Sequence, residues 1–265
     1  YIENLTSVTA EKERIGAELN VATQIQASML PSVFPVPYPD RKDFDIFAIM
    51  EPAKEVGGDF YDFYFIDDDN LAFLMADVSG KGIPAAMFMM QSKTIIKSCA
   101  ESGMSVEQVF TVANEKLCEG NDAGMFVTAW MGILNVKTGK VLFANAGHNP
   151  PLVKHADGTY EYLKTRAGFV LAGMEGVRYR GNELELAPGD AIYLYTDGVT
   201  EATDLNTELY GEDRLHTVLE KYKDAAPQVI CDEVKRDVDA FVGEAPQFDD
   251  ITMLALKYNG QEDAQ

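Results

Sequence analysis

Residues 76–82 read Ala-Asp-Val-Ser-Gly-Lys-Gly, between the apolar run Leu71–Met75 and Ile83-Pro84. The apolar run predicts a strand that delivers Asp77 into a glycine-rich turn. Pro84 then fits the first turn of a helix, where its missing N–H costs nothing. A carboxylate at a strand end beside exposed backbone oxygens suits a hard divalent cation. Taken alone, however, an Asp at such a turn more often caps a helix, and the lysine lacks the surrounding string of a P-loop.

Three further acidic turns stand at the ends of predicted strands: Gly57-Gly58-Asp59, Thr196-Asp197-Gly198 and Phe248-Asp249-Asp250. Clustered carboxylates repel one another and raise one another's pKa values unless cations compensate their charge. Oxygen ligands without Cys or paired His favour Mg²⁺ or Mn²⁺ over zinc. Two such ions about 3.5–4 Å apart can activate water for in-line attack on a phosphate. The sequence therefore predicts a two-metal site.

The order of the predicted elements indicates the fold class. Strands come in runs and helices are bunched between them, which is typical of a layered α+β fold with largely antiparallel sheets. A turn at 57–62 leads into one strand, which ends at the run 67–70. The other predicted strands cover 44–51, 71–76, 126–136, 140–146, 151–154, 160–163, 183–186, 191–195 and 251–258, and the predicted helices cover 1–30, 84–102, 106–119, 212–222 and 226–242.

Composition limits the classes of partner. The 265 residues include 22 Lys+Arg and 43 Asp+Glu, so the formal net charge is −21. This balance argues against nucleic acid and anionic membranes, because both attract basic surfaces. It also disfavours phosphate binding unless bound cations reverse the local field. Three widely spaced cysteines without a CxxC predict a reducing, cytoplasmic location.

The first thirty residues predict one long helix. Val8, Ile15, Ala22 and Met29 recur every seven residues, while Lys12 and Gln26 interrupt the seam. This pattern fits either a short parallel coiled coil that forms a homodimer or a helix packed on its own domain. The chain opens without Met inside the pattern, so we expect a fragment of a longer protein, which could be membrane-anchored. The expected organisation is a helical linker at 1–30, one domain at 31–260 and a polar tail at 261–265.

Five motifs occur in an order that resembles a known family. GGDFYD (57–62), ADVSGKG (76–82), NAGHNPP (145–151), YTDGVTE (195–201) and FDDIT (248–252) resemble the PPM-type metal-dependent Ser/Thr protein phosphatases. They look most like the bacterial SpoIIE/RsbU branch, and the resemblance runs from about residue 22 to residue 258. It implies a four-layer α-β-β-α sandwich with two antiparallel sheets.

The resemblance also implies a function and roles for residues. Asp77 would bridge two Mn²⁺ or Mg²⁺ ions, helped by the backbone oxygen of Val78. Asp59 would serve one ion, and Asp197 and Asp249 the other. Asp250 competes with Asp249 for this role. The substrate would be phosphoserine or phosphothreonine on a regulatory protein, by analogy an anti-sigma-factor antagonist. An upstream sensor domain would act by repacking the N-terminal helix, which would move the helix after residue 84 and the Asp77 turn.

Several features leave alternatives open. No arginine stands near the first acidic motif to orient a phosphate, which leaves Arg166, Arg178 and Arg180 as candidates. His148 could be a general acid, although a loop-fixing hydrogen bond is the simpler role. Residues 167–176 could form a flap over the substrate or a packed connection, and the acidic run 67–69 predicts a solvated hairpin turn. The rival functions are a non-catalytic scaffold, which should have lost a carboxylate, and a small-nucleotide phosphohydrolase.

Overall fold

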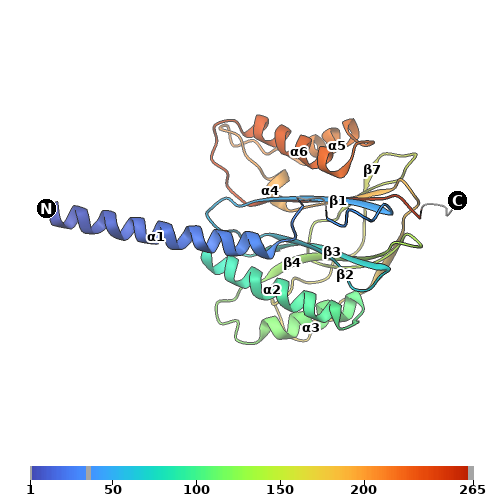
Figure 1. Ribbon diagram of the computed structural model, residues 1–265, viewed down its shortest axis with the longest axis horizontal. Coiled ribbons are helices and arrows are strands. Elements are labelled where there is room, and N and C mark those ends of the chain that lie inside the picture. The colour runs from blue at the N-terminus through green and yellow to red at the C-terminus, as the bar shows by residue number, and fades with distance from the viewer. Residues whose placement is uncertain (1, 34–36, 262–265) are drawn as a thin grey trace.

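The computed structural model describes residues 2–33 and 37–261 of the protein. Two antiparallel five-stranded sheets are stacked face to face between layers of helices (Figure 1). The predicted fold class is therefore confirmed. Residues 1, 34–36 and 262–265 lie outside the described residues, so the first residue of the predicted helix and most of the predicted tail are not described. The proposed boundaries at 30, 31 and 260 stay predictions.

The two sheets draw on strands from the whole chain. The first sheet has the order β1-β10-β9-β6-β7 and the second the order β2-β3-β4-β5-β8. The strands are β1 Phe44–Glu51, β2 Phe60–Phe65, β3 Asn70–Val78, β4 Val127–Asn135, β5 Lys140–Ala146, β6 Leu152–Lys154, β7 Tyr160–Tyr162, β8 Asn182–Glu185, β9 Ala191–Tyr195 and β10 Ile251–Tyr258.

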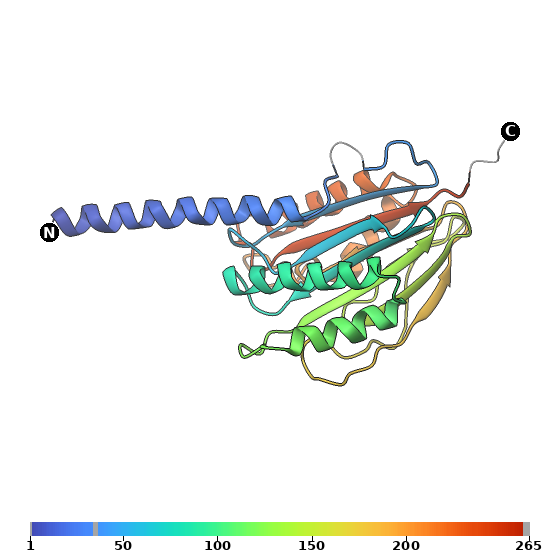
Figure 2. The same ribbon diagram turned by 60° about the horizontal axis from the view of Figure 1, so that its bottom comes forward.

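Helices cover the outer face of each sheet. Figure 2 shows α2 and α3 side by side against the second sheet, while α5 and α6 lie on the first sheet in Figure 1. A short helix, α4, follows directly after β9 and was not predicted. The helices are α1 Ile2–Met29, α2 Ile83–Glu101, α3 Val106–Cys118, α4 Asp197–Thr200, α5 Glu212–Lys221 and α6 Pro227–Val242.

Strand β3 explains why its sequence is an unbroken apolar run. Leu71, Phe73 and Met75 pack between the two sheets. Leu74 and Ala76, on the other face, pack toward α2 and α3. Alternate side chains of a strand point to opposite faces, so a strand that is buried on both faces must be apolar throughout. A third apolar cluster joins the first sheet to α5 and α6. The apolar core thus ends near the acidic turns.

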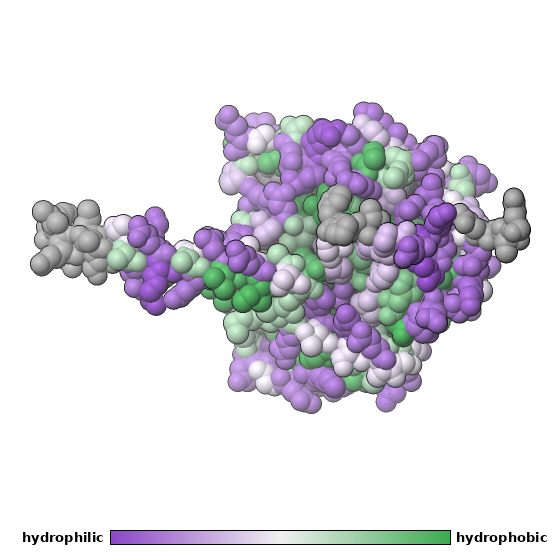
Figure 3. All heavy atoms as spheres, in the orientation of Figure 1, coloured by the Kyte–Doolittle hydropathy of each residue, from purple (hydrophilic) through white to green (hydrophobic). Residues whose placement is uncertain are grey.

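Helix α1 projects from the body, and only its last turns pack on it (Figures 1 and 2). Val8 and Ile15 are 67% and 46% exposed, and Figure 3 shows apolar side chains among polar ones along this helix. Gln26, in contrast, is buried. The predicted helix is therefore present, and its projecting part carries apolar residues that this chain does not cover. In the described part of the chain, no helix is long and apolar enough to cross a bilayer.

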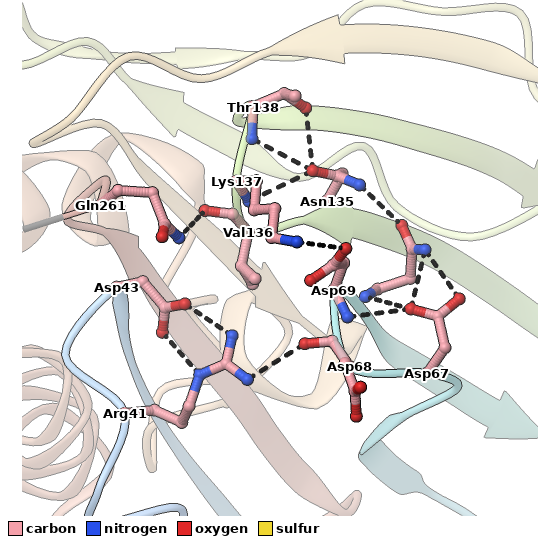
Figure 4. A network of polar contacts seen from close by, with 11 residues as sticks. Arg41, Asp43, Asp67, Asp68, Asp69, Asn135, Val136, Lys137, Thr138 and Gln261 are labelled. Carbon is pink, nitrogen blue, oxygen red and sulfur yellow. Dashed lines mark hydrogen bonds and ion pairs between the residues drawn. The ribbon is translucent and has the colours of Figure 1, made fainter.

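The acidic turn between β2 and β3 is a hydrogen-bonded hairpin turn. One carboxylate oxygen of Asp67 accepts hydrogen bonds from the N–H groups of Asp69 and Asn70, each at 2.9 Å. The side-chain hydrogen bond from Asn70, followed by the backbone bond from Asp69, lowers the pKa of Asp67. Figure 4 shows Lys137 paired with Asp69 at 2.8 Å and Arg41 donating to the same turn. The carboxylates of Asp67 and Asp69 thus have protein hydrogen-bond donors, as expected of a solvated hairpin turn.

Residues 167–176 form a packed connection along the edge of the second sheet. Leu171 exchanges two backbone hydrogen bonds with Val127, at 2.8 and 3.0 Å. Gly168 donates from its backbone to Asn145 at 2.8 Å. Leu171 is fully buried, whereas Phe169 is half exposed. These contacts hold the segment against β4 and β5, so the packed alternative is correct and the flap alternative is wrong.

Candidate metal centre

The second sheet brings Asp59 and Asp77 together. β2 and β3 pair antiparallel with Phe60 opposite Ala76, so the residue before β2 lies beside the residue near the end of β3. Asp59 is 2% exposed. A Cβ atom at Gly58 would lie 2.9 Å from the carbonyl oxygen of Val78, so the glycine lets the two turns approach closely.

The first sheet brings Asp197 and the pair Asp249-Asp250 together. β9 and β10 are antiparallel neighbours, and β9 ends where β10 begins. Asp197 starts α4 directly after β9. A Cβ at Gly198 would lie 1.9 Å from the carbonyl oxygen of Asp250, so only glycine fits at this crossing. The predicted acidic turns therefore meet at one end of the sandwich.

Two threonines connect the sheets through Asp59. Thr196 Oγ1 donates to Asp59 Oδ2 at 2.6 Å, and Thr252 Oγ1 donates to the same oxygen at 2.7 Å. Both threonines are fully buried. They belong to the motifs YTDGVTE and FDDIT, yet we did not predict a role for either. The signal was present, because each threonine stands next to or near an acidic residue of the first sheet.

Asp249 and Asp250 have different surroundings. Asp250 is buried, and its carboxylate accepts backbone hydrogen bonds from Ala53 at 2.8 Å, Gly58 at 2.7 Å and Asp59 at 3.3 Å. Asp249 has a side chain that is 33% exposed and pairs with Lys81 at 3.1 Å. Asp250 therefore holds the loop that carries Asp59, whereas the Asp249 carboxylate is accessible to an ion.

Burial and mutual repulsion perturb the carboxylates. Burial, followed by the charge of Asp77, holds the pKa of Asp59 well above its usual range. Burial and the charge of Asp197 raise the pKa of Asp77 to about 7. The pKa of Asp197 is also raised, by burial and by Glu201. The site thus concentrates negative charge in a poorly solvated place, where a divalent cation would be most strongly stabilised.

The donor set fits a hard divalent cation, since it consists of carboxylate and carbonyl oxygens. Within residues 2–33 and 37–261, however, no three Asp, Glu, His or Cys side chains already converge as a ligand set. The carboxylates are near enough to perturb one another's pKa values, but a bound ion would have to draw them inward.

His148 fixes a loop. Its Nδ1 lies 2.9 Å from Thr128 Oγ1 and its Nε2 lies 3.0 Å from the Tyr195 carbonyl oxygen. Its backbone N–H donates to Asn145. Burial lowers the pKa of His148 to about 4. A neutral, fully engaged imidazole has no free proton to give, so the geometry favours the loop-fixing role.

The arginine candidates are exposed, and two of them lie along α3. Gly176 donates from its backbone to Glu115 at 2.6 Å, and Gly181 lies against Glu107. The segment with Arg178 and Arg180 therefore follows α3 on the outer face of the second sheet. The carboxylates, in contrast, lie at the ends of strands between the sheets. Arg166 precedes the packed connection.

The end of α1 contacts the loop that leads to Asp59. Gln26 Nε2 donates to the carbonyl oxygen of Gly57 at 2.6 Å, and the Gly57 N–H donates to Gln26 Oε1 at 3.0 Å. Gln26 also lies 3.7 Å from the sulfur of Met89 on α2. One buried amide therefore joins α1, the acidic turn and α2.

Comparison with known proteins decides the family. The family described as Stage II sporulation protein E (SpoIIE) matches residues 67–259, well over half of the chain. The chain belongs to the SpoIIE family. It is 31% identical over 249 residues to phosphoserine phosphatase RsbU of Bacillus subtilis, covering 93% of this chain and 71% of RsbU.

One further relative and two solved structures are also similar to this chain. Protein IcfG of Synechocystis sp. is 31% identical over 290 residues; the match covers 98% of this chain but only 45% of IcfG. The SiaA-PP2C domain of Pseudomonas aeruginosa has the same fold, with a TM-score of 0.82, 23% identity and coverage of 94% and 99%. RsbX, solved in complex with magnesium, shares the fold with a TM-score of 0.63, 16% identity and coverage of 82% and 96%.

Proposed function

We propose that this SpoIIE-family chain is a metal-dependent phosphoprotein phosphatase that hydrolyses phosphoserine or phosphothreonine. The observation that carries the proposal is the convergence of four acidic turns, two from each sheet, at one end of the sandwich. Crowded carboxylates whose pKa values are raised by burial and by one another's charge are typical of a functional site. The relationship to RsbU, which is named a phosphoserine phosphatase, supports the same chemistry.

Two Mn²⁺ or Mg²⁺ ions fit the carboxylates in a definite pattern. Asp77, helped by the carbonyl oxygen of Val78, would hold both ions. Asp59 would hold one ion, and Asp197 and Asp249 the other. When bound, the ions would supply an activated water nucleophile and the positive charge that a phosphate needs.

The protein's own groups keep this arrangement in place. Thr196 and Thr252 both donate to one oxygen of Asp59, which fixes the orientation of the carboxylate. Asp250 holds the backbone of the same loop. Preorganisation of this kind lets the site bind ions and substrate without ordering a loop at each turnover.

The substrate we propose is a phosphorylated regulatory protein of the anti-sigma-factor antagonist class. This part rests on analogy with the RsbU branch. The net charge of −21 disfavours nucleic acid as a partner. It also disfavours nucleoside di- and triphosphates, since they carry more negative charge than a phosphorylated side chain does.

We further propose that α1 transmits a signal from an upstream sensor domain and can pair with α1 of a second copy. Exposed Val8 and Ile15, seven residues apart, fit a coiled-coil seam. Gln26 connects the helix to the turn before Asp59 and to α2. Deleting residues 1–20 should change oligomeric state or Mn²⁺ affinity. Unchanged dimerisation, affinity and activity would contradict this role.

The substrate class is tested by turnover of three phosphate esters in Mn²⁺. We expect a phosphoserine peptide and an aryl phosphate to be hydrolysed and a nucleoside triphosphate to be hydrolysed at least about tenfold more slowly. Asp77→Asn is the matched inactive control. Preference for the nucleotide would favour the small-molecule phosphohydrolase instead.

A further inference from the structure

Lys81 is fixed against the acidic cluster by three contacts. Its ammonium nitrogen lies 3.1 Å from Asp249 Oδ2 and 3.9 Å from the centre of the Phe248 ring. It also donates a hydrogen bond to the Phe248 carbonyl oxygen. The side chain is 28% exposed, so the ammonium group remains accessible from solvent. A cation is therefore built into the mouth of the candidate metal centre.

The turn that carries Lys81 holds it in this direction. Gly80 and Gly82 have φ values of 83° and 74°, which other residues adopt only with strain. Ser79 exchanges hydrogen bonds with Phe126, at 2.9 Å each, and anchors the turn to β4. The lysine thus leaves a fixed backbone just four residues after Asp77 in sequence.

Lys81 pairs with a carboxylate that is proposed to hold an ion. Asp197 and Asp249 are the two residues proposed to hold the same ion, and the Lys81 ammonium nitrogen lies 3.1 Å from Asp249 Oδ2. Lys81 therefore lies beside the proposed site of that ion.

A phosphate needs such a cation here. The chain has 43 acidic and 22 basic residues, and the site itself collects carboxylates. The arginines considered from the sequence do not fill this place, since Arg178 and Arg180 follow α3 on the outer face of the second sheet. A lysine is a compact point charge with three donors on a flexible stem, which suits a phosphate oxygen.

We propose that Lys81 binds the phosphate group of the substrate, and that its ion pair with Asp249 is the resting position from which it is transferred. The inference rests on the proposed phosphatase function and names the phosphate-orienting residue of that site. Asp249 would hold an ion that binds the phosphate, and the Lys81 ammonium group, 3.1 Å from Asp249 Oδ2, would be near that phosphate.

The transfer of Lys81 from Asp249 to phosphate predicts different effects on the binding of Mn²⁺ and on the binding of phosphate. In the resting state Lys81 competes with a metal ion for Asp249, so removing its charge should leave Mn²⁺ affinity unchanged or increase it. The same change removes a charge-assisted hydrogen bond to phosphate and should weaken phosphate binding by about tenfold to a hundredfold. A lysine with a merely structural role would not separate the two ligands in this way.

The test is calorimetry on the full 265-residue chain, first with Mn²⁺ alone and then with inorganic phosphate added to the Mn²⁺-loaded protein. The variants are Lys81→Gln, Lys81→Arg and Lys54→Gln. Lys54 is the matched control, because its stem lies 3.7 Å from a Cβ placed at Gly82, next to the same turn. We expect weakened phosphate binding in Lys81→Gln only, with Lys81→Arg within about threefold of the wild type.

Three results would overturn the inference: phosphate affinity of Lys81→Gln within about threefold of the wild type, an equal loss in Lys54→Gln, or a parallel loss of Mn²⁺ affinity. Neither titration requires turnover. A wild-type protein that binds Mn²⁺ and phosphate but hydrolyses no phosphate ester would speak against the proposed function, while the comparison of variants would still decide the role of Lys81.

Discussion

The carboxylate of Asp250 lies 2.7 Å from the backbone nitrogen of Gly58, across 192 residues of sequence. The same carboxylate accepts hydrogen bonds from Ala53 and Asp59. It therefore ties the start of β10, in the first sheet, to the loop that opens β2, in the second. Its neighbour Asp249 is directed to the outside, where it meets Lys81. Of these two adjacent aspartates, Asp250 thus holds the loop of Asp59 in place, and Asp249 is accessible to an ion.

This division predicts different defects for two otherwise matched variants. Asp250→Asn removes an acceptor from buried N–H groups and should lower the free energy of unfolding by about 2 kcal/mol. Asp249→Asn should change it by less than about 0.5 kcal/mol but weaken Mn²⁺ binding by roughly tenfold or more. Urea unfolding and calorimetry measure the two quantities. The reverse pattern would make Asp250 the metal ligand.

Gln26 should couple α1 to the candidate metal centre. Gln26→Ala leaves the buried N–H and carbonyl groups of Gly57 without their partner, so we expect a loss of about 1–3 kcal/mol in stability. Mn²⁺ affinity should fall as well, because Asp59 lies two residues after Gly57 in the sequence. The control is Gln24→Ala, an exposed glutamine on the same helix. Equal effects of the two variants would argue against a specific coupling.

His148 should make the protein sensitive to acid. Its pKa is lowered from 6.5 to about 4 in the folded state, so below pH 6.5 the unfolded chain takes up a proton that the folded chain does not. The resulting stability is present above pH 6.5 and is lost as the pH falls toward 4, by up to about 3 kcal/mol. Asp59 and Asp77, whose pKa values are raised, contribute with the opposite sign.

The contribution of His148 is isolated by comparison with His148→Asn. The difference in unfolding free energy between wild type and variant should shrink between about pH 7.5 and about pH 4.5. His216→Gln is the control, since that side chain is 40% exposed. A difference that does not change with pH would show that the imidazole is not held neutral.

Asp62 and Lys93 form a buried ion pair between β2 and α2, at 2.7 Å, with side chains 2% and 8% exposed. Lys93→Met should cost about 3–5 kcal/mol, because it leaves a buried carboxylate without its partner. The double variant Asp62→Leu/Lys93→Met should recover most of that loss. Denaturant unfolding of all three proteins gives the coupling. A double variant no more stable than Lys93→Met would contradict a dominant charge effect.

Most of the fold could be predicted because its signals are local. The two-sided apolar run of β3 and the turns at strand ends are visible in the sequence. Helix α4 was missed because it has only four residues and contains Gly198, which is a poor helix former. That glycine is required by contact with the Asp250 backbone, and such a contact cannot be seen in the sequence.

The carboxylates of the candidate site could be predicted from the sequence, but the contacts that connect them could not. Which of Asp249 and Asp250 faces the ions depends on the direction of each side chain at the start of β10. The roles of Thr196, Thr252 and Lys81 depend on contacts between sheets or turns that are distant in sequence. Family resemblance located the motifs, and only packing separated the residues that hold the site from those that face a ligand.

The most direct test of the two-metal account is hydrolysis of an aryl phosphate in Mn²⁺ and in EDTA, for the wild type, Asp77→Asn and Asp69→Asn. Asp69 is the control because it lies in the hairpin turn, paired with Lys137. The account predicts Mn²⁺-dependent turnover that survives in Asp69→Asn and falls at least about a hundredfold in Asp77→Asn. Turnover that persists in EDTA or in Asp77→Asn would contradict it.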